Sequence, residues 1–186
     1  MINEALVNEF EKEFTAAGGI FVKVKERLKA VSYIQKVLKE KGSDTCVSWD
    51  EPPLNEILGG LKDVKIINAQ ASNSEWRSSA ITSEIGVTSA DFAISNTGTV
   101  VLKAGNGKGR LASLLPPVHI CVVDSKRFVS DISEIFAQTK GMNVEAQREF
   151  LTTCLTFITG PSRTADIELT LTIGVHGPKE VHVVVI

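Results

Sequence analysis

Apolar side chains in the first forty residues recur at helical spacing, with one short interruption. From Leu6 to Phe14 they lie four residues apart, which is the repeat of one helix face. A second helical pattern covers residues 26–40, and the apolar run at 20–24 between the two is typical of a short strand. The pattern therefore predicts an N-terminal helical arm, residues 1–43, that packs on the rest of the chain.

From residue 44 onward, short apolar runs alternate with helical and glycine-rich segments. The runs of strand length cover 45–49, 64–68, 92–95, 99–103, 119–123, 153–159 and 180–186. Four helices are predicted between these runs: one begins at Leu54, one lies around Trp76, and two cover residues 130–139 and 143–150. Residues 165–174 alternate apolar and polar side chains, so we expect a strand there as well. Strands interleaved with helices indicate one α/β domain, residues 44–186, with a largely parallel central sheet.

The loops of this predicted sheet indicate where a ligand would bind. In sheets of this kind, ligands bind beyond the carboxyl ends of the strands. The loops that follow 92–95, 99–103 and 153–159 are rich in Gly, Ser and Thr. We therefore expect these three loops to meet at that edge and to form the functional face.

Composition and charge narrow the classes of function. The net charge of −2 gives no general attraction to nucleic acid, and an aromatic content of 6% offers little base stacking. No run of 18 apolar residues is present, so we expect no membrane span, and the acidic N-terminus is unlike a signal peptide. Cys46, Cys121 and Cys154 lie far apart in apolar runs, which is typical of buried free thiols in a reducing cytosol. With no CxxC pair and no histidines at ligand spacing, no metal site is expected.

Two glycine-containing segments could bind an anion. Thr97-Gly98-Thr99 combines a permissive backbone with two hydroxyls, although a hairpin turn has the same composition. AGNGKGR (104–110) could form an anion nest or a flexible hairpin loop. Of its two cations we favour Arg110, because it precedes an apolar run that could hold it in place. Lys108 is expected to be solvated.

The segment GPSRT (160–164) follows an apolar run and ends in polar side chains. Ser162, Arg163 and Thr164 suit a carboxylate or phosphate, because arginine can contact such a group with two parallel hydrogen bonds. A capped turn without a ligand explains the same residues equally well. The pattern therefore predicts either an anion site or a turn at this junction.

Two carboxylates and one histidine nearby could transfer protons. Asp166 and Glu168 would share one face of a strand, as general acid and base or as structural partners of an arginine. His176 lies in the loop GVHGP and could act as a base or hydrogen-bond donor. His119 and His182 lie in apolar runs and are typical of core or edge positions.

Three longer motifs carry a resemblance to a known family. GVTSADFAISNTGTVVL, RLASLLPPVHICVV and TGPSRTADIELTLTIGVHGPKEVHVVVI follow one another along the chain. Over roughly residues 44–186 the chain resembles the lactate-utilisation (LUD) domain, and more closely the LutC/YkgG family. The resemblance implies a Rossmann-like α/β sandwich similar to the NagB, RpiA and CoA-transferase fold. It also implies a bacterial cytoplasmic system in which such a protein and two iron–sulfur proteins oxidise L-lactate to pyruvate. The clusters would belong to the partners, and this chain would hold no cofactor.

The resemblance also implies a set of site residues. Carried onto this sequence, the family's motifs place a cleft at Thr97, Gly98, Thr99, Arg110, Ser162, Arg163, Asp166, Glu168 and His176, with Glu84 as a weaker candidate. In that cleft Arg163 or Arg110 would hold the lactate carboxylate, and His176 or a carboxylate would take the hydroxyl proton. The chain alone would then be inactive. Two alternatives stay open: a stand-alone enzyme of the CoA-transferase or phosphosugar-isomerase kind, and a regulatory protein that binds a small anion.

Overall fold

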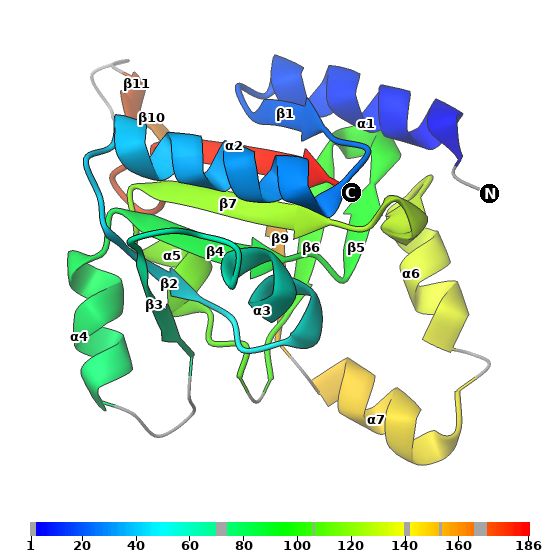
Figure 1. Ribbon diagram of the computed structural model, residues 1–186. Helices are drawn as coiled ribbons and strands as arrows, with labels where there is room; N and C mark the ends of the chain where they lie inside the picture. The colour runs from blue at the N-terminus through cyan, green and yellow to red at the C-terminus, as the bar shows by residue number, and fades with distance from the viewer. Residues whose placement is uncertain (1–2, 70–73, 106, 140–141, 153, 166–170) are drawn as a thin grey trace.

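The centre of the molecule is a six-stranded parallel sheet (Figure 1). The computed structural model describes residues 3–69, 74–105, 107–139, 142–152, 154–165 and 171–186. Across the sheet the strands are β1 (Ile20–Lys23), β12 (Glu180–Val185), β7 (Val118–Val123), β4 (Ile85–Ser89), β2 (Thr45–Ser48) and β3 (Lys65–Asn68). Every neighbouring pair runs parallel. All six residues of β7 are buried, as its apolar sequence requires of a strand covered on both faces.

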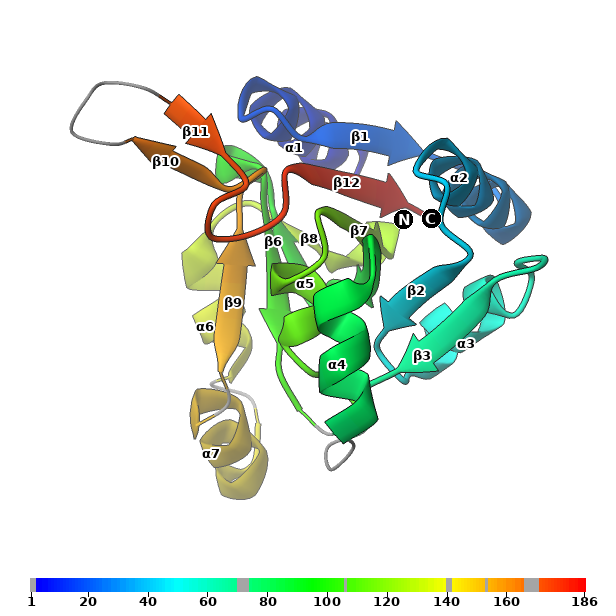
Figure 2. The ribbon, with the colours of Figure 1, turned by 90° about the vertical axis from the view of Figure 1, so that its left-hand side faces the viewer.

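Helices cover both faces of this sheet. The seven helices of the described residues are α1 (Glu4–Ala16), α2 (Arg27–Glu40), α3 (Pro52–Leu58), α4 (Ser74–Thr82), α5 (Leu111–Leu114), α6 (Ile132–Thr139) and α7 (Val144–Thr152). Figure 2 shows α2 and α3 on one face and α4 and α5 on the other. This placement follows from the strand order, because crossovers that move in opposite directions along a sheet lie on opposite faces.

A second sheet packs beside the first. It contains β8 (Phe128–Val129), β5 (Phe92–Ile94), β6 (Thr99–Lys103) and β9 (Leu155–Ile158), in that order. β6 runs antiparallel to both β5 and β9. A short antiparallel pair, β10 (Arg163–Ala165) and β11 (Leu171–Ile173), extends from the end of β9, and two 3₁₀ turns, η1 (Ser95–Thr97) and η2 (Ser125–Arg127), complete the described elements.

The predicted α/β class and the largely parallel central sheet are confirmed. Two details are wrong. The strands that form within the predicted runs 92–95, 99–103 and 153–159, namely β5, β6 and β9, belong to the second sheet rather than the parallel one. The segment 165–174 is not one strand, because β10 and β11 pair with each other, and residues 166–170 between them lie outside the described residues. β4 was missed, since its sequence IGVTS has neither a continuous apolar run nor a regular alternation.

The N-terminal segment contributes more than helices. β1 forms one edge of the central sheet by pairing in parallel with β12, from Ile20 beside His182 to Lys23 beside Val185. On α1 the buried side chains are Val7, Phe10 and Phe14, which lie on one helix face as the spacing predicts. Residues 3–43 therefore supply both covering helices and a strand of the sheet.

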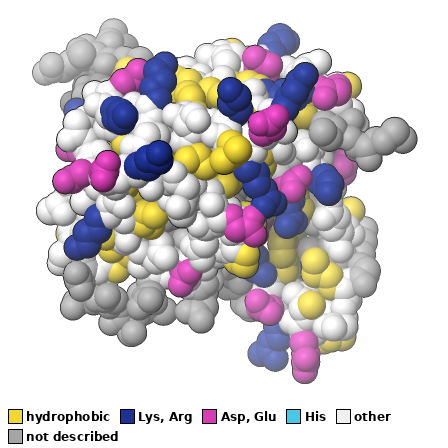
Figure 3. Space-filling view, viewed as in Figure 1, with side chains coloured by type: hydrophobic (Ala, Val, Ile, Leu, Met, Phe, Trp, Pro, Cys, Tyr) yellow, Lys and Arg dark blue, Asp and Glu magenta, His cyan; other side chains and the backbone are white. Residues whose placement is uncertain are grey.

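The surface carries charges of both signs. Figure 3 shows Lys and Arg side chains interspersed with Asp and Glu over the face seen in Figure 1. This mixture agrees with the net charge of −2. Among the helices that the structure describes, none is long and apolar enough to cross a bilayer.

Candidate functional site

Three threonine hydroxyls meet at one end of the second sheet. The strand register places the end of β5, the start of β6 and the end of β9 side by side. The Oγ1 atom of Thr99 lies 2.8 Å from that of Thr97 and 2.8 Å from that of Thr159. We call these three residues the threonine cluster. It borders a cavity of about 260 Å³, whose other lining residues are Ile94, Asn96, Ile132 and Phe157.

Gly98 has a structural reason to be glycine. Its φ is +60°, a left-handed conformation that other residues rarely adopt, and a Cβ there would lie 2.3 Å from the backbone nitrogen of Phe14. The turn between β5 and β6 is therefore pressed against α1. The segment is thus the turn of a hairpin between β5 and β6. The hydroxyls of Thr97 and Thr99 beside Gly98 border the cavity of about 260 Å³.

The segment 160–164 lies next to the threonine cluster. The exposed Arg163 guanidinium donates to the carbonyl of Ala17, the C-cap residue of α1, where a cation is electrostatically favoured. The half-buried Ser162 donates its N–H to the carbonyl of Pro178 at 2.9 Å, which brings the loop of the exposed His176 alongside. This loop leads into β12, so these residues sit at the amino edge of the parallel sheet.

The remaining predicted residues are distributed elsewhere. Thr164 is half-buried in β10. Asp166 and Glu168 lie outside the described residues. The exposed Glu84 directly precedes β4, at the amino edge of the parallel sheet.

Arg110 lies at the far end of β6 from the threonine cluster. Its Nη1 is 3.7 Å from the sulfur of Cys154, just before β9. From Thr99 to Lys103 the strand rises by about 3.4 Å per residue, so roughly 14 Å separates the two ends. A ligand as small as lactate cannot contact Arg110 and the threonine cluster together.

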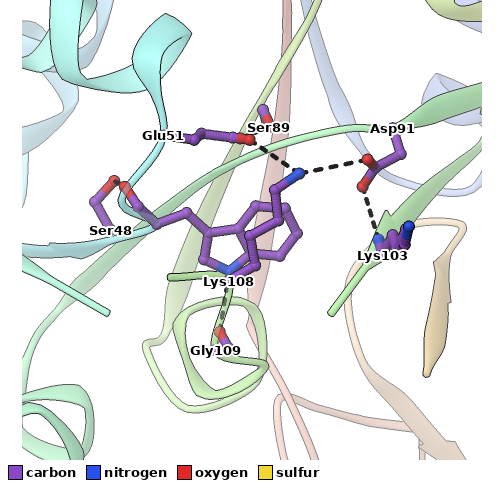
Figure 4. Close-up of polar contacts among 8 residues, drawn as sticks. Ser48, Glu51, Ser89, Asp91, Lys103, Lys108 and Gly109 are labelled. Atoms are coloured by element: carbon purple, nitrogen blue, oxygen red, sulfur yellow. Dashed lines mark hydrogen bonds and ion pairs between the residues drawn. The ribbon is translucent and has the colours of Figure 1, made fainter. Parts of the chain in front are cut away.

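A polar cluster that the sequence alone does not predict lies at the carboxyl edge of the parallel sheet (Figure 4). The Lys108 ammonium is 2.9 Å from Glu51 Oε2 and 3.4 Å from Asp91 Oδ1, and it lies 4.9 Å from the centre of the Trp49 ring. Only 22% of the Lys108 side chain is exposed. The expectation that Lys108 is solvated is therefore wrong. We call Glu51, Asp91 and Lys108 the lysine–carboxylate cluster.

Hydrogen bonds fix both carboxylates of this cluster. Ser89, the last residue of β4, donates its hydroxyl to Glu51. The backbone N–H of Lys103 donates to Asp91 Oδ2 at 2.7 Å. The two acids follow β2 and β4 closely, so the parallel sheet itself brings them to the same edge.

The glycine-rich loop holds the lysine in position. Trp49 donates its indole N–H to the carbonyl of Gly109 at 3.0 Å, and the Asp50 N–H donates to the carbonyl of Gly107 at 2.8 Å. A Cβ on Gly109 would lie 2.4 Å from the Trp76 ring. Because Gly109 has no side chain, the loop can pack closely against Trp76 and against the residues that follow β2. In this position the loop directs Lys108 toward the two carboxylates.

A cavity of about 120 Å³ opens beside the lysine–carboxylate cluster, and we call it the carboxyl-edge cavity. Its lining residues follow several strands of the parallel sheet and are Arg27, Glu51, Pro53, Ser89, Ala90, Asp91, Lys108, Val122, Asp124, Arg127 and Ile186. The chain leaves β2 toward β3 but leaves β4 toward β7, in the opposite direction across the sheet. Such a reversal opens a crevice at the carboxyl edge, where ligands bind in α/β sheets.

No grouping of three or more His, Cys, Asp or Glu side chains suited to a metal ion occurs among the described residues. Cys46 and Cys121 are buried, as predicted, whereas Cys154 is exposed. The exposure of Cys154 corrects its expected burial. It lies before the short edge strand β9, where its apolar neighbours in sequence do not cover it.

The fold and the carboxyl-edge cavity define an α/β domain of the kind that binds small polar ligands at the ends of parallel strands. The family model described as "LUD domain" matches residues 7–186. The chain therefore belongs to the LUD domain family, as its three motifs predict. The match also includes most of the N-terminal segment.

Relatives and a solved structure agree with this assignment. Lactate utilization protein C of Halalkalibacterium halodurans is 34% identical over 149 residues, covering 78% of this chain and 64% of that protein. The protein of the same name from a Geobacillus species is 33% identical over 179 residues, covering 89% and 69%. The chain thus spans about two thirds of the length of these relatives. A DUF162 family protein from Deinococcus radiodurans matches 98% of this chain and 96% of its own, with a TM-score of 0.66 and 23% identity, which shows the shared fold.

Proposed function

We propose that this chain is a component of a bacterial lactate-utilisation system. The observation that carries the proposal is the similarity to Lactate utilization protein C, which reaches 33% identity over 89% of the chain. In the proposed system L-lactate is oxidised to pyruvate in the cytoplasm. The chain contributes a site for a small carboxylate, and its partners contribute the electron acceptor.

The partners we propose are two iron–sulfur proteins. Oxidation of L-lactate to pyruvate releases a pair of electrons together with two protons, so the reaction requires a carrier for the electrons. Iron–sulfur clusters in the partners supply that carrier, as the family resemblance implies. This chain then needs no cofactor of its own.

The predicted residues remain candidates for the carboxylate site. Thr97 and Thr99 line one cavity with Thr159, and Arg163 lines a neighbouring cavity that Thr159 also borders. Ser162 directly precedes Arg163. Arg163 would have to share its guanidinium between a ligand and the carbonyl of Ala17. Asp166 and Glu168 remain proposed proton acceptors, together with His176. Arg110 is the weakest of the predicted residues, because of its distance from the others.

A second candidate function has one observation in its favour. A lysine held between two carboxylates at the carboxyl edge could perform acid–base chemistry in a stand-alone enzyme of the phosphosugar-isomerase kind. Against it, a cavity of about 120 Å³ is well below the roughly 300–1,000 Å³ of pockets for larger ligands. A coenzyme A ester or a sugar phosphate would extend far outside this cavity.

The test is L-lactate-dependent reduction of an artificial electron acceptor under anaerobic conditions. The full chain is assayed alone and then with two iron–sulfur proteins of the kind proposed as its partners. We expect reduction only in the mixture. Activity of the chain alone, or an inactive mixture whose clusters are spectroscopically intact, would contradict the proposal. Turnover of sugar phosphates by the chain alone would establish the second candidate.

A further inference from the structure

We propose that the carboxyl-edge cavity binds a short-chain 2-hydroxy acid, with Arg127 as the anchor for the acid's carboxylate and the lysine–carboxylate cluster as the partner of its hydroxyl. The choice of a hydroxy acid rests on the proposed function. The choice of the cavity rests on its lining residues and their partners. It differs from Ser162, Arg163 and His176 at the amino edge of the parallel sheet, which we call the amino-edge residues and which the sequence motifs favour.

The three cations of this cavity differ in their partners. Arg27 is paired with Glu56, and Lys108 is paired with Glu51 and Asp91. Among the described residues no carboxylate pairs with Arg127, which is exposed at the cavity rim. Arg127 is therefore the cation whose guanidinium is available for a ligand carboxylate, which it can contact through two parallel hydrogen bonds.

A hydrogen-bonded turn places the backbone of Arg127 at the end of β7. Asp124 follows β7 directly and accepts the Lys126 N–H on its Oδ1 at 2.8 Å, which closes the turn η2. The Arg127 N–H donates to the carbonyl of Asp124 at 2.9 Å. The backbone that carries Arg127 is thus held in a capped turn at the end of a buried strand.

The lysine–carboxylate cluster, which lines the same cavity as Arg127, suits a hydroxyl group. An ammonium has three N–H donors, and Lys108 directs two of them at Glu51 and Asp91, so one remains for a ligand oxygen. Each carboxylate oxygen can accept a further hydrogen bond, so either acid can accept one from the hydroxyl of the ligand. A 2-hydroxy acid carries its carboxylate and hydroxyl on adjacent carbons, so it offers one group to the guanidinium of Arg127 and another to the donor–acceptor cluster that lines the same small cavity.

The charges of the cavity also favour such a ligand over a simple anion. Its lining side chains comprise three cations and three carboxylates, the latter being Glu51, Asp91 and Asp124. The charges of the lining therefore balance, and the cavity does not attract every anion by its net charge. A ligand must therefore satisfy the carboxylates as well as the guanidinium. Because a site that hydrogen-bonds a hydroxyl discriminates against analogues without it, we expect propionate to bind far more weakly than L-lactate.

The test is calorimetric titration of the full chain with L-lactate and with propionate, which lacks only the hydroxyl. We expect at least tenfold weaker propionate binding. Arg127→Gln should weaken binding of both acids at least tenfold, whereas Lys126→Gln, a matched control in the same turn but outside the cavity, should leave both unchanged. Lys108→Met should remove most of the discrimination between the two acids.

Three results would overturn the inference. They are absence of L-lactate binding to the folded chain, equal affinity for the two acids, and unchanged lactate binding in Arg127→Gln. Loss of lactate binding in Arg163→Ala, with Arg127→Gln unaffected, would assign the ligand to the amino-edge residues instead. Arg127 is exposed, so its variant should keep the wild-type circular dichroism and melting temperature. If Lys108→Met does not fold, Arg127→Gln still decides the outcome.

Failure of the inference is distinguishable from failure of the proposed function. If the anaerobic mixture oxidises lactate and Arg127→Gln changes neither binding nor rate, the function stands and the assigned cavity is wrong. If L-lactate binds in an Arg127-dependent manner but the mixture is inactive, the cavity assignment stands and the proposed system is wrong.

Discussion

His119 is a fully buried histidine at the second position of β7. Its Nε2 lies 2.8 Å from the hydroxyl of Thr88 on the neighbouring strand. Burial lowers its pKa from 6.5 to about 3, and the nearby His182 acts in the same direction. The sequence predicts such a core role for both histidines, because each lies in an apolar run, and both are buried.

This histidine should make the fold sensitive to acid. Between pH 6.5 and about 3 the unfolded chain holds a proton that the folded chain lacks. The free energy of unfolding therefore falls as pH drops, by up to about 1.4 kcal/mol per pH unit. Urea unfolding of His119→Asn from pH 7 to 4 should show a shallower slope than the wild type. The exposed His176→Asn serves as control, and equal slopes in the wild type and His119→Asn would contradict the argument.

Lys108 and Arg110 show where reasoning from single residues fails. Both follow glycines in one short loop, and the apolar run after Arg110 favours the wrong cation, because Arg110 is exposed and only 22% of the Lys108 side chain is. The burial of Lys108 depends on Glu51 and Asp91, which precede it in the chain by 57 and 17 residues. Such a cluster exists only once the strands are paired, so the sequence predicts the loop but not its partners.

At the scale of elements, periodicity predicts the strands well but not the sheet to which each belongs. The segments at 92–95 and 99–103 have the same apolar character as those of the parallel sheet. Their hairpin connection makes β5 and β6 antiparallel, and this separates them from strands joined by helical crossovers. The loops after β5 and β6 consequently lie at opposite ends, which divides the predicted site.

The glycine-rich loop gives a prediction at this scale. Gly109→Ala should lower the free energy of unfolding by about 1–3 kcal/mol, because its Cβ would overlap the Trp76 ring. It should also displace Lys108 and reduce the preference for L-lactate over propionate. Gly105→Ala is the matched control, since a Cβ there meets no atom within 4 Å. Urea unfolding and calorimetric titration measure the two effects, and equal stabilities of the two variants would rule out the close packing described for Gly109.

At the scale of the whole molecule, Phe10 joins parts of the chain that are far apart in sequence. The centre of its ring lies 5.4 Å from the ring centre of Phe14, 6.1 Å from that of Phe21 on β1 and 5.3 Å from that of Phe128 on β8. One side chain of α1 therefore contacts residues of both sheets. The N-terminal segment belongs to the same core as the rest of the molecule.

Truncation of this side chain should destabilise the whole protein. We expect Phe10→Ala to lower the free energy of unfolding by about 3–5 kcal/mol, as is typical when a buried aromatic ring is removed. Phe157→Ala, whose side chain is 42% exposed, should have a much smaller effect. Urea unfolding monitored by both fluorescence and circular dichroism makes the measurement. A separate early transition in Phe10→Ala, with the main transition unchanged, would instead identify residues 1–43 as an independent arm.

The place of β12 in the sheet has a consequence for how the protein is made. β12 follows the other five strands of the central sheet along the chain and so leaves the ribosome after them, yet it lies inside the sheet between β1 and β7. Until it emerges, β1 has no neighbour in this sheet, and β7 presents an open apolar edge. The nascent chain must therefore wait for residues 180–185 before the six strands can join, and during that interval it depends on protection from premature association.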